Sequence, residues 1–170
     1  ISAPVQIPPT GYTAFTVRRG EPGRPTRYPE TPGLATSERS MANEYLDVTI
    51  ESNGTLTVTD KRSGKTYSRL LTFEDCADIG DGWYHGVAVN DQVFASSACQ
   101  ADVALVHNGP MLTTFRIRTT MRVPDSFHFD TMTRADTFVE MPLDSTVSLR
   151  PGTDRIEVQT TVHNTADDHR

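Results

Sequence analysis

The segment from Thr72 to Asp91 holds the residue types in this chain that are best suited to bind a ligand. Four of its acidic side chains, Glu74, Asp75, Asp78 and Asp81, run directly into a Gly-Trp-Tyr-His cluster. Carboxylates accept hydrogen bonds from hydroxyl groups, and flat aromatic rings cover the C–H faces of sugars. The combination therefore favours a carbohydrate ligand. The alternative interpretation is a solvated acidic loop whose tryptophan packs against the core.

The sequence shows no pattern of a self-sufficient catalytic site. No nucleophile elbow, P-loop or dinucleotide-binding glycine pattern is present. A glycosidase needs two carboxyl groups that face each other across roughly 5–9 Å, and neighbours on one short loop seldom achieve this. We therefore predict that none of the residues in this chain is catalytic.

The sequence also predicts no metal site. The five histidines are spread out, without the His-x-x-x-His or Cys-x-x-Cys spacing of zinc sites. Asp75, Asp78 and Asp81 do not form the acidic series ending in glutamate that marks a calcium-binding loop. A bound metal is therefore not expected within the chain.

Charge and composition exclude several classes of protein. The net charge is −6 and the basic residues are scattered, so a nucleic-acid partner is not expected. No apolar run approaches the roughly 20 residues that span a bilayer, and the first residues do not resemble a signal peptide. Cys76 and Cys99 do not make a disulfide framework, which predicts free thiols and a cytoplasmic location.

The first quarter of the chain differs in composition from the rest. Tyr12 to Val17 alternates like a strand, whereas residues 19–42 are rich in Pro, Gly, Arg, Glu and Ser. Such a segment buries too little apolar surface to order itself. Residues 19–42 are therefore predicted to be an exposed linker, and a domain is predicted from Asn43 onward.

From Asn43 onward apolar residues recur with a period of two, the pattern of strands with one buried face. Asn53-Gly54 lies between two alternating runs, which predicts a type I′ hairpin turn more than a glycosylation site. Many such strands, with turn signals about every ten residues, predict an antiparallel β-sandwich.

One long strand is predicted between Met111 and Val123, with apolar residues on one face and Arg116, Arg118 and Arg122 on the other. A face with three arginines is usually solvated, or it meets the acids of a neighbouring domain.

Four segments form an ordered series of motifs. The first is Ile7-Pro-Pro-Thr-Gly-Tyr-Thr-Ala-Phe-Thr-Val17, and the second runs from Asn43-Glu-Tyr-Leu-Asp-Val through Asn53-Gly-Thr-Leu to Tyr67. The third is Phe73-Glu-Asp-Cys-Ala-Asp-Ile-Gly-Asp-Gly-Trp-Tyr84, and the last is Val162-His-Asn-Thr-Ala-Asp-Asp-His-Arg170. In this order, over nearly the whole chain, they resemble the C-terminal half of glycoside hydrolase family 38, the α-mannosidases.

The resemblance refines the predicted fold. It implies a β-supersandwich with a galactose-mutarotase-like fold, of which residues 43–170 form the N-terminal part, a partial domain. Residues 1–18 correspond to the end of a preceding small β-domain. Members of this family are several times longer, and the chain stops within the last motif, so it is expected to be a piece of a larger enzyme.

The resemblance also implies a function. In this family the nucleophilic aspartate and a zinc ion belong to an N-terminal α/β-barrel domain, and the residues of those motifs do not occur here. The implied protein is a zinc-dependent retaining α-mannosidase, which removes terminal α-D-mannosyl residues and whose β-sandwich forms part of the sugar-site wall beside the barrel domain.

The resemblance also implies which residues contact the substrate. Asp81, Trp83, Tyr84 and His85 are expected to contact a mannose-containing oligosaccharide. Many relatives have tyrosine where this chain has Trp83, and an indole donates a hydrogen bond but does not accept one. Further contacts, at the sugar or at the seam between domains, are expected from Asp78, Asp168, His169 and Arg170.

Two alternatives stay open at this point. The first is a non-catalytic carbohydrate-binding module in which Trp83 and Tyr84 hold a glycan by themselves. The second is a purely structural sandwich between domains that contacts no sugar.

Overall fold

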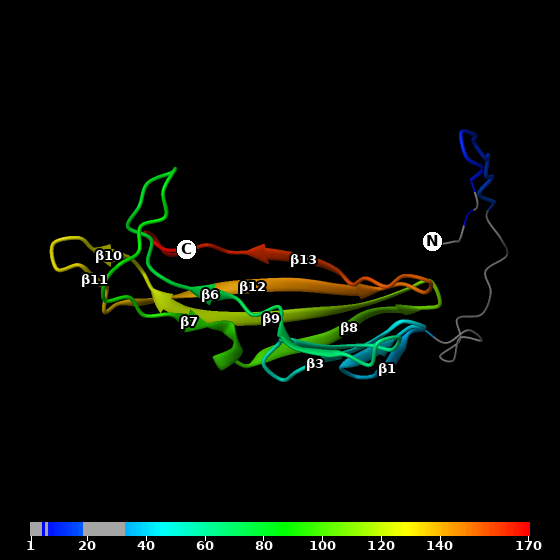
Figure 1. The fold of residues 1–170 in the computed structure, drawn as a ribbon, viewed down its shortest axis with the longest axis horizontal. Helices are drawn as coiled ribbons and strands as arrows, with labels where there is room; N and C mark the ends of the chain where they lie inside the picture. Colours follow the sequence, from blue (N-terminus) through cyan, green and yellow to red (C-terminus); the bar gives the residue numbers. More distant parts are fainter. Residues whose placement is uncertain (1–4, 6, 19–32) are drawn as a thin grey trace.

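The computed structural model describes residues 5, 7–18 and 33–170. Regular structure in these residues consists of antiparallel strands and one short 3₁₀ helix, η1 (Ser96–Ala98). Figure 1 shows the strands in two main layers, with the five-stranded sheet below the four-stranded sheet. No helix in the described part of the chain is long and apolar enough to cross a membrane.

The five-stranded sheet is built from consecutive strands, each paired with the next. They are β1 (Ala35–Ser37), β2 (Ser40–Ala42), β3 (Leu46–Ile50), β4 (Leu56–Asp60) and β5 (Thr66–Leu70).

The four-stranded sheet contains the longest strands. In spatial order they are β13 (Glu157–Val162), β12 (Phe138–Leu149), β9 (Leu112–Pro124) and β8 (Ala101–Gly109). Two small sheets complete the fold: β6 (Glu74–Asp75) with β7 (Phe94–Ala95), and β10 (Phe127–His128) with β11 (Thr133–Arg134).

The two large sheets share one hydrophobic core. Val48 and Ile50 from the first sheet pack in the same buried cluster as Phe115 and Val147 from the second. Every second residue of the facing strands is buried, which is the pattern that a half-buried strand requires. Two sheets whose inner faces meet in this way form a β-sandwich, so the predicted antiparallel β-sandwich is confirmed.

The hairpin between β3 and β4 forms as predicted, but its turn is of another type. A type I′ turn needs positive φ at both central residues, and only Gly54 has it, at 83°. Gly54 N–H donates to Glu51 C=O across 3.0 Å, and Glu51 N–H donates to Thr55 C=O across 2.8 Å. This is a three-residue loop with a glycine bulge. Asn53 also uses its amide to donate to Ser97 C=O at 3.0 Å, which leaves it poorly suited to glycosylation.

The predicted linker is wrong for its last residues, because β1 and β2 lie within it. Met41 is only 1% exposed in the core shared by the sheets, and Leu34 packs against the same cluster. Leu34 N–H also donates to the Thr113 hydroxyl at 3.0 Å. These two apolar side chains, with strand pairing to β3, are enough to order residues 34–42. The part of the linker at residues 19–32 lies outside the described residues.

The strand predicted at Tyr12 to Val17 does not form. Residues 11–18 have no regular structure, and the side chains of Tyr12 and Val17 are 90% and 85% exposed. An alternating sequence needs a partner strand and a surface to cover, and the described part of the chain pairs no strand with these residues.

Candidate functional site

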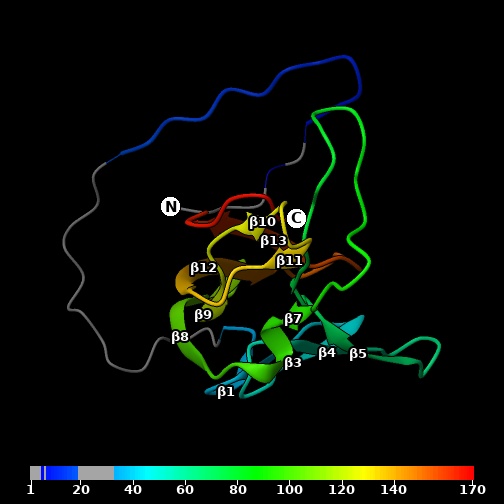
Figure 2. The same ribbon diagram turned by 90° about the vertical axis from the view of Figure 1, so that its left-hand side faces the viewer.

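Most of the predicted site residues lie in one long loop, residues 76–93, which connects β6 to β7. In both Figure 1 and Figure 2 this green loop projects beyond the sheets, in the direction away from the five-stranded sheet. Ile79 N–H donates to Gly86 C=O and Asp81 N–H donates to Tyr84 C=O, each across 3.0 Å. These bonds close residues 79–86 into a narrow finger.

Asp78 organises the base of the finger. Its Oδ1 accepts hydrogen bonds from the backbone N–H groups of Gly80 and Gly86, both at 2.9 Å. Its Oδ2 lies 3.1 Å from Nδ1 of His85. The two backbone donors, followed by His85, lower the pKa of Asp78 to about 2. Asp78 is therefore ionised at neutral pH, and both of its oxygens are already engaged within the loop.

Asp81 organises the tip in a similar way. Its Oδ1 accepts from the backbone N–H groups of Trp83 and Tyr84, at 2.8 and 2.9 Å. An aspartate that caps the amides two and three residues later stabilises a tight turn. Both of these bonds use the same oxygen, so Oδ2 is available to accept a hydrogen bond from a ligand.

Two glycines make the finger narrow. A Cβ atom on Gly80 would collide with the backbone of Tyr84, and one on Gly86 would collide with the backbone of Gly80. Neither collision is with a flexible side chain, so only glycine fits at these two positions. Gly82, at the tip, has open space around it.

The tip of the finger and the residues that follow the finger present a largely apolar surface to solvent. Trp83 is 91% exposed, Tyr84 76%, Val87 70% and Val89 91%. The alternative in which the tryptophan packs against the core is therefore wrong, because its side chain is almost fully exposed. Clustered exposed side chains of this size usually mark a site of contact with a ligand or another protein surface.

A buried polar cluster lies where the loop leaves the sandwich. Asp75 is 1% exposed, and its Oδ2 accepts from Nη1 of Arg134 at 2.7 Å. Its Oδ1 lies 2.6 Å from Nδ1 of His169. Nε2 of His169 in turn lies 2.9 Å from Oδ1 of Asn164, so both ring nitrogens face acceptors. Asp75 thus joins three segments that are far apart in sequence.

The last residues of the chain pair with the beginning of the loop. Cys76 and Arg170 exchange two backbone hydrogen bonds, at 3.0 and 2.8 Å, and Asp78 N–H donates to Asp168 C=O at 2.9 Å. The structure therefore brings the predicted residues Asp168, His169 and Arg170 next to Asp78. In this arrangement the ring of His169 belongs to the buried polar cluster and is not exposed at the finger.

Sequence reasoning missed Arg134 and Asn164. Arg134 lies outside every motif, and its partner Asp75 is 59 positions away. Asn164 lies within the last motif, five residues before its partner His169, but no ligand-binding pattern marks it. Only the three-dimensional arrangement reveals their role.

The residues able to contact a sugar are therefore fewer than the sequence implied. Asp81 retains a free acceptor, Trp83 offers a ring face, and Tyr84 offers a hydroxyl that donates and accepts. His85 lies beside them but is paired with Asp78. In the described residues no group of three or more His, Cys, Asp or Glu side chains is placed to hold a metal ion. This loop is suited to binding and carries no complete set of catalytic groups.

Comparison with known proteins identifies the family to which this β-sandwich belongs. Residues 41–169 match the model of the glycosyl hydrolases family 38 C-terminal domain. The chain therefore belongs to that family, as its C-terminal domain.

Individual relatives are similar over most of this chain. It is 26% identical to a putative mannosylglycerate hydrolase of Halalkalibacterium halodurans, in a match that covers 79% of this chain and 16% of the relative. An α-mannosidase from Enterococcus faecalis V583 superposes with a TM-score of 0.77 and 28% identity, covering 81% of this chain and 17% of that one. A family 38 protein from Enterococcus faecalis gives 0.78 and 27%, covering 87% and 19%. The chain spans less than a fifth of the length of these relatives.

Proposed function

We propose that this chain is part of a zinc-dependent retaining α-mannosidase and that its finger, residues 79–86, forms part of the wall of the sugar site. The observation that carries the proposal is the exposed tip, where Trp83, Tyr84 and a free oxygen of Asp81 stand together on a rigid support. Membership of family 38 and the likeness to a solved α-mannosidase support the reaction class.

Each tip residue has a distinct role in this proposal. The indole of Trp83 packs against the C–H face of a mannose ring. Oδ2 of Asp81 accepts a hydrogen bond from one sugar hydroxyl, and the Tyr84 hydroxyl donates to or accepts from another. Asp78 does not touch the sugar but holds the base of the finger, because its oxygens bind Gly80, Gly86 and His85.

The zinc ion and the catalytic groups belong elsewhere in the enzyme. The described residues offer no cluster of metal ligands, so they do not fit a zinc site. In the proposal, the zinc ligands and the nucleophile lie on a barrel domain outside this chain. We accordingly expect the isolated 170-residue chain not to hydrolyse aryl α-mannosides, with or without added zinc.

The proposal also places the enzyme in the cytoplasm. Cys76 and Cys99 are both free, and burial raises the pKa of each thiol, so neither is a reactive thiolate. Unpaired cysteines are typical of a reducing compartment.

Substitution of Asp81 in the full-length enzyme tests the site. In Asp81→Asn the amide oxygen can still accept from the Trp83 and Tyr84 N–H groups, so the loop should keep its shape. The second carboxylate oxygen is lost, which removes a charge-assisted hydrogen bond of roughly 1.5–3 kcal/mol. We expect kcat/KM for an aryl α-mannoside to fall about ten- to a hundredfold. Full activity in Asp81→Asn would show that the finger is structural.

A carbohydrate-binding module is the second candidate, and the exposed Trp83 and Tyr84 also favour it. Trp83 is the only tryptophan of the chain, so its fluorescence reports on a bound ligand. If the chain forms only one wall of the sugar pocket, it should bind mannobiose too weakly to detect, because most contacts with the sugar lie on the other domain. A saturable fluorescence change on titrating mannobiose into the 170-residue chain would favour the module.

A further inference from the structure

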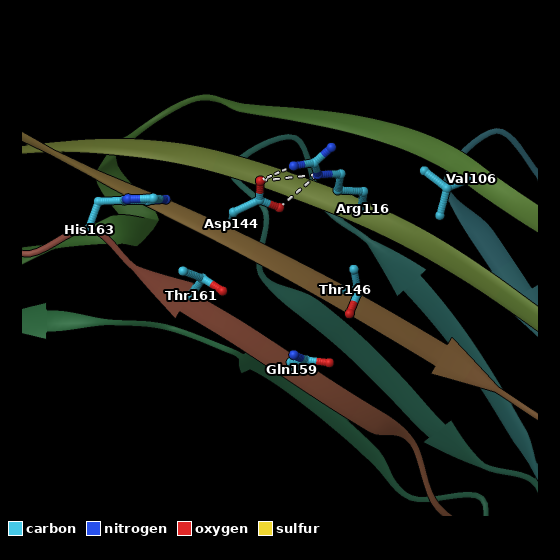
Figure 3. Close-up of a pocket in the computed structure, with 7 residues that line it drawn as sticks. All are labelled: Val106, Arg116, Asp144, Thr146, Gln159, Thr161 and His163. Carbon is cyan, nitrogen blue, oxygen red and sulfur yellow. Dashed lines mark hydrogen bonds and ion pairs between the residues drawn. The ribbon is translucent and has the colours of Figure 1, made fainter.

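The face of the four-stranded sheet that points away from the core is concave and almost entirely polar. Figure 3 shows a hollow on this face, lined from β9, β12 and β13 by Arg116, Asp144, Thr146, Gln159 and Thr161, and by His163, which directly follows β13. It encloses about 530 Å³. A second hollow of about 330 Å³ adds Asp102 and Arg118 and shares Asp144 and His163 with the first. Together the two hollows form one outer-face groove.

An ion pair between Arg116 and Asp144 lies in the middle of the groove. Nε of Arg116 donates to Oδ1 of Asp144 at 2.8 Å and to Oδ2 at 3.1 Å, and its Nη2 also contacts Oδ2. Arg118 approaches the same carboxylate at 3.4 Å. Arg116 lowers the pKa of Asp144, so the carboxylate is ionised and fixes the guanidinium beside it. Two of the three arginines predicted to lie on a solvated face or to meet the acids of a neighbouring domain, Arg116 and Arg118, thus contact an acid on the adjacent strand of their own sheet.

The groove has as many guanidinium groups as carboxylates, and it offers both hydrogen-bond donors and acceptors. Two guanidinium groups face two carboxylates, those of Asp102 and Asp144, within the same surface. Thr146, Thr161 and Gln159 add hydroxyl and amide groups that both donate and accept. An anionic ligand has no excess positive charge to bind here. A neutral molecule with many hydroxyl groups can pair with every one of these side chains.

The groove is less suited to a protein surface or another sheet. The centre of a protein interface is usually apolar and poor in charges, and a sheet face that packs on another sheet is apolar. Here Val106 is the one large aliphatic side chain of the first hollow. The volume lies within the roughly 300–1,000 Å³ of small-molecule sites.

We propose that the outer-face groove is a second glycan-binding site, which holds sugar units of a mannose-containing polysaccharide away from the bond that is cleaved. The choice of mannose, rather than another neutral sugar, rests on the proposed function. The four-stranded sheet turns its outer face away from the five-stranded sheet, and the finger projects on that same side (Figures 1 and 2). In the proposal a long glycan contacts both. The groove has no tryptophan or tyrosine platform, so it binds weakly and acts on long glycans.

Affinity electrophoresis tests the proposal in the full-length protein that contains this chain. The probe is yeast mannan cast into a native gel, which retards even weak binders. The test variant is Thr146→Val with Gln159→Ala, which removes two ligand groups that make no side-chain hydrogen bond to the described chain and leaves the Arg116–Asp144 pair intact. Lys65→Ala, an exposed side chain beside β5, is the matched control.

We expect the unaltered protein and Lys65→Ala to be retarded equally. In the double variant the dissociation constant for mannan should rise about three- to tenfold, because two neutral hydrogen bonds are lost. Equal retardation of the double variant, or no retardation of the unaltered protein, overturns the proposal. A double variant with a lowered melting temperature shows instead that the groove is covered by another part of the protein, and also overturns it.

Hydrolysis of p-nitrophenyl α-mannoside by the unaltered protein tests the proposed function separately. If this activity is absent but mannan still retards the protein through Thr146 and Gln159, the groove stands as a glycan site and the α-mannosidase proposal fails. If the activity is present without retardation, the groove proposal fails alone.

Discussion

Nη1 of Arg134 lies 2.7 Å from Oδ2 of Asp75, and both side chains are almost fully buried, at 4% and 1% exposure. The two residues are 59 positions apart and join β11 to the strand that enters the finger. The Arg134 guanidinium also lies over the Phe94 ring, 5.6 Å from its centroid. This buried pair fixes the point from which the loop of residues 76–93 projects.

Removal of Arg134 should destabilise the protein strongly. In Arg134→Met the carboxylate of Asp75 stays buried and loses its guanidinium partner, and breaking such a pair costs about 3–5 kcal/mol. Urea denaturation gives the free energy of unfolding. Arg155→Met, an exposed arginine, is the control and should change it by less than about 0.5 kcal/mol. An Arg134→Met protein as stable as its parent would show that the pair adds nothing.

Lowering the pH should release the base of the finger only below the pH at which carboxylates of ordinary pKa become protonated. The folded-state pKa of Asp78, about 2, lies below its usual value of 3.8, so the stabilisation is complete above pH 4. It is lost as the pH falls from about 4 through 2, when the carboxyl group becomes protonated. The amide proton shifts of Gly80 and Gly86, which donate to Asp78, should titrate in NMR with a midpoint near 2. Asp78→Asn should abolish that step, and a midpoint near 4 would contradict the prediction.

Alanine substitutions should reduce activity at Gly80 and Gly86, where a side chain has no room, but not at Gly82, which has open space around it. Gly80→Ala and Gly86→Ala force the finger open, because the new Cβ collides with backbone atoms. Displacement of the tip should reduce kcat/KM for aryl α-mannosides on the order of ten- to a hundredfold in the full-length enzyme. Gly82→Ala meets nothing and should keep full activity. Equal activity of all three variants would mean that the shape of the finger does not matter.

Trp83 should matter for activity more than for stability. At 91% exposure its ring packs against little in this chain, so Trp83→Ala should change the melting temperature by no more than a degree or two. It should nevertheless lower kcat/KM, whereas Trp83→Tyr should be tolerated because a flat ring remains. Thermal unfolding and steady-state kinetics distinguish these effects. A large loss of stability in Trp83→Ala would indicate a packing role.

Asn43 should be a major structural residue. Its Nδ2 donates to the carbonyls of Arg150 and Thr153, both at 2.7 Å, and its Oδ1 accepts from Tyr45 and Leu46 N–H groups. Asn43→Ala leaves several largely buried groups unpaired, and each unpaired group costs about 1–3 kcal/mol. We expect a clear fall in the urea midpoint, whereas Glu51→Ala, an exposed change in the turn after β3, should cost far less. A small effect at Asn43 would show that water replaces these bonds.

The sequence by itself determined the strands and the class of fold. Alternation at Leu46, Val48 and Ile50 identifies a strand with one buried face, because side chains on a strand point alternately to its two sides. Gly54 identified the hairpin, although a three-residue loop replaced the predicted type I′ turn. The motif around Asp75, Asp78 and Asp81 located the projecting loop, because aspartates and glycines at close spacing form turns through local hydrogen bonds.

Only the tertiary structure decided which residues from distant parts of the chain lie beside one another. Asp75 and Asp81 belong to one motif, yet Asp75 is buried against Arg134 and Asp81 caps an exposed tip. The sequence pattern cannot separate these roles, because the partner of Asp75 comes from a distant strand. The direction of Trp83 also depends on how the loop leaves the sandwich. The outer-face groove likewise appears only when β9, β12 and β13 lie side by side. Antiparallel pairing places Arg118 opposite Asp144, and Arg116 reaches the same carboxylate from the diagonal position.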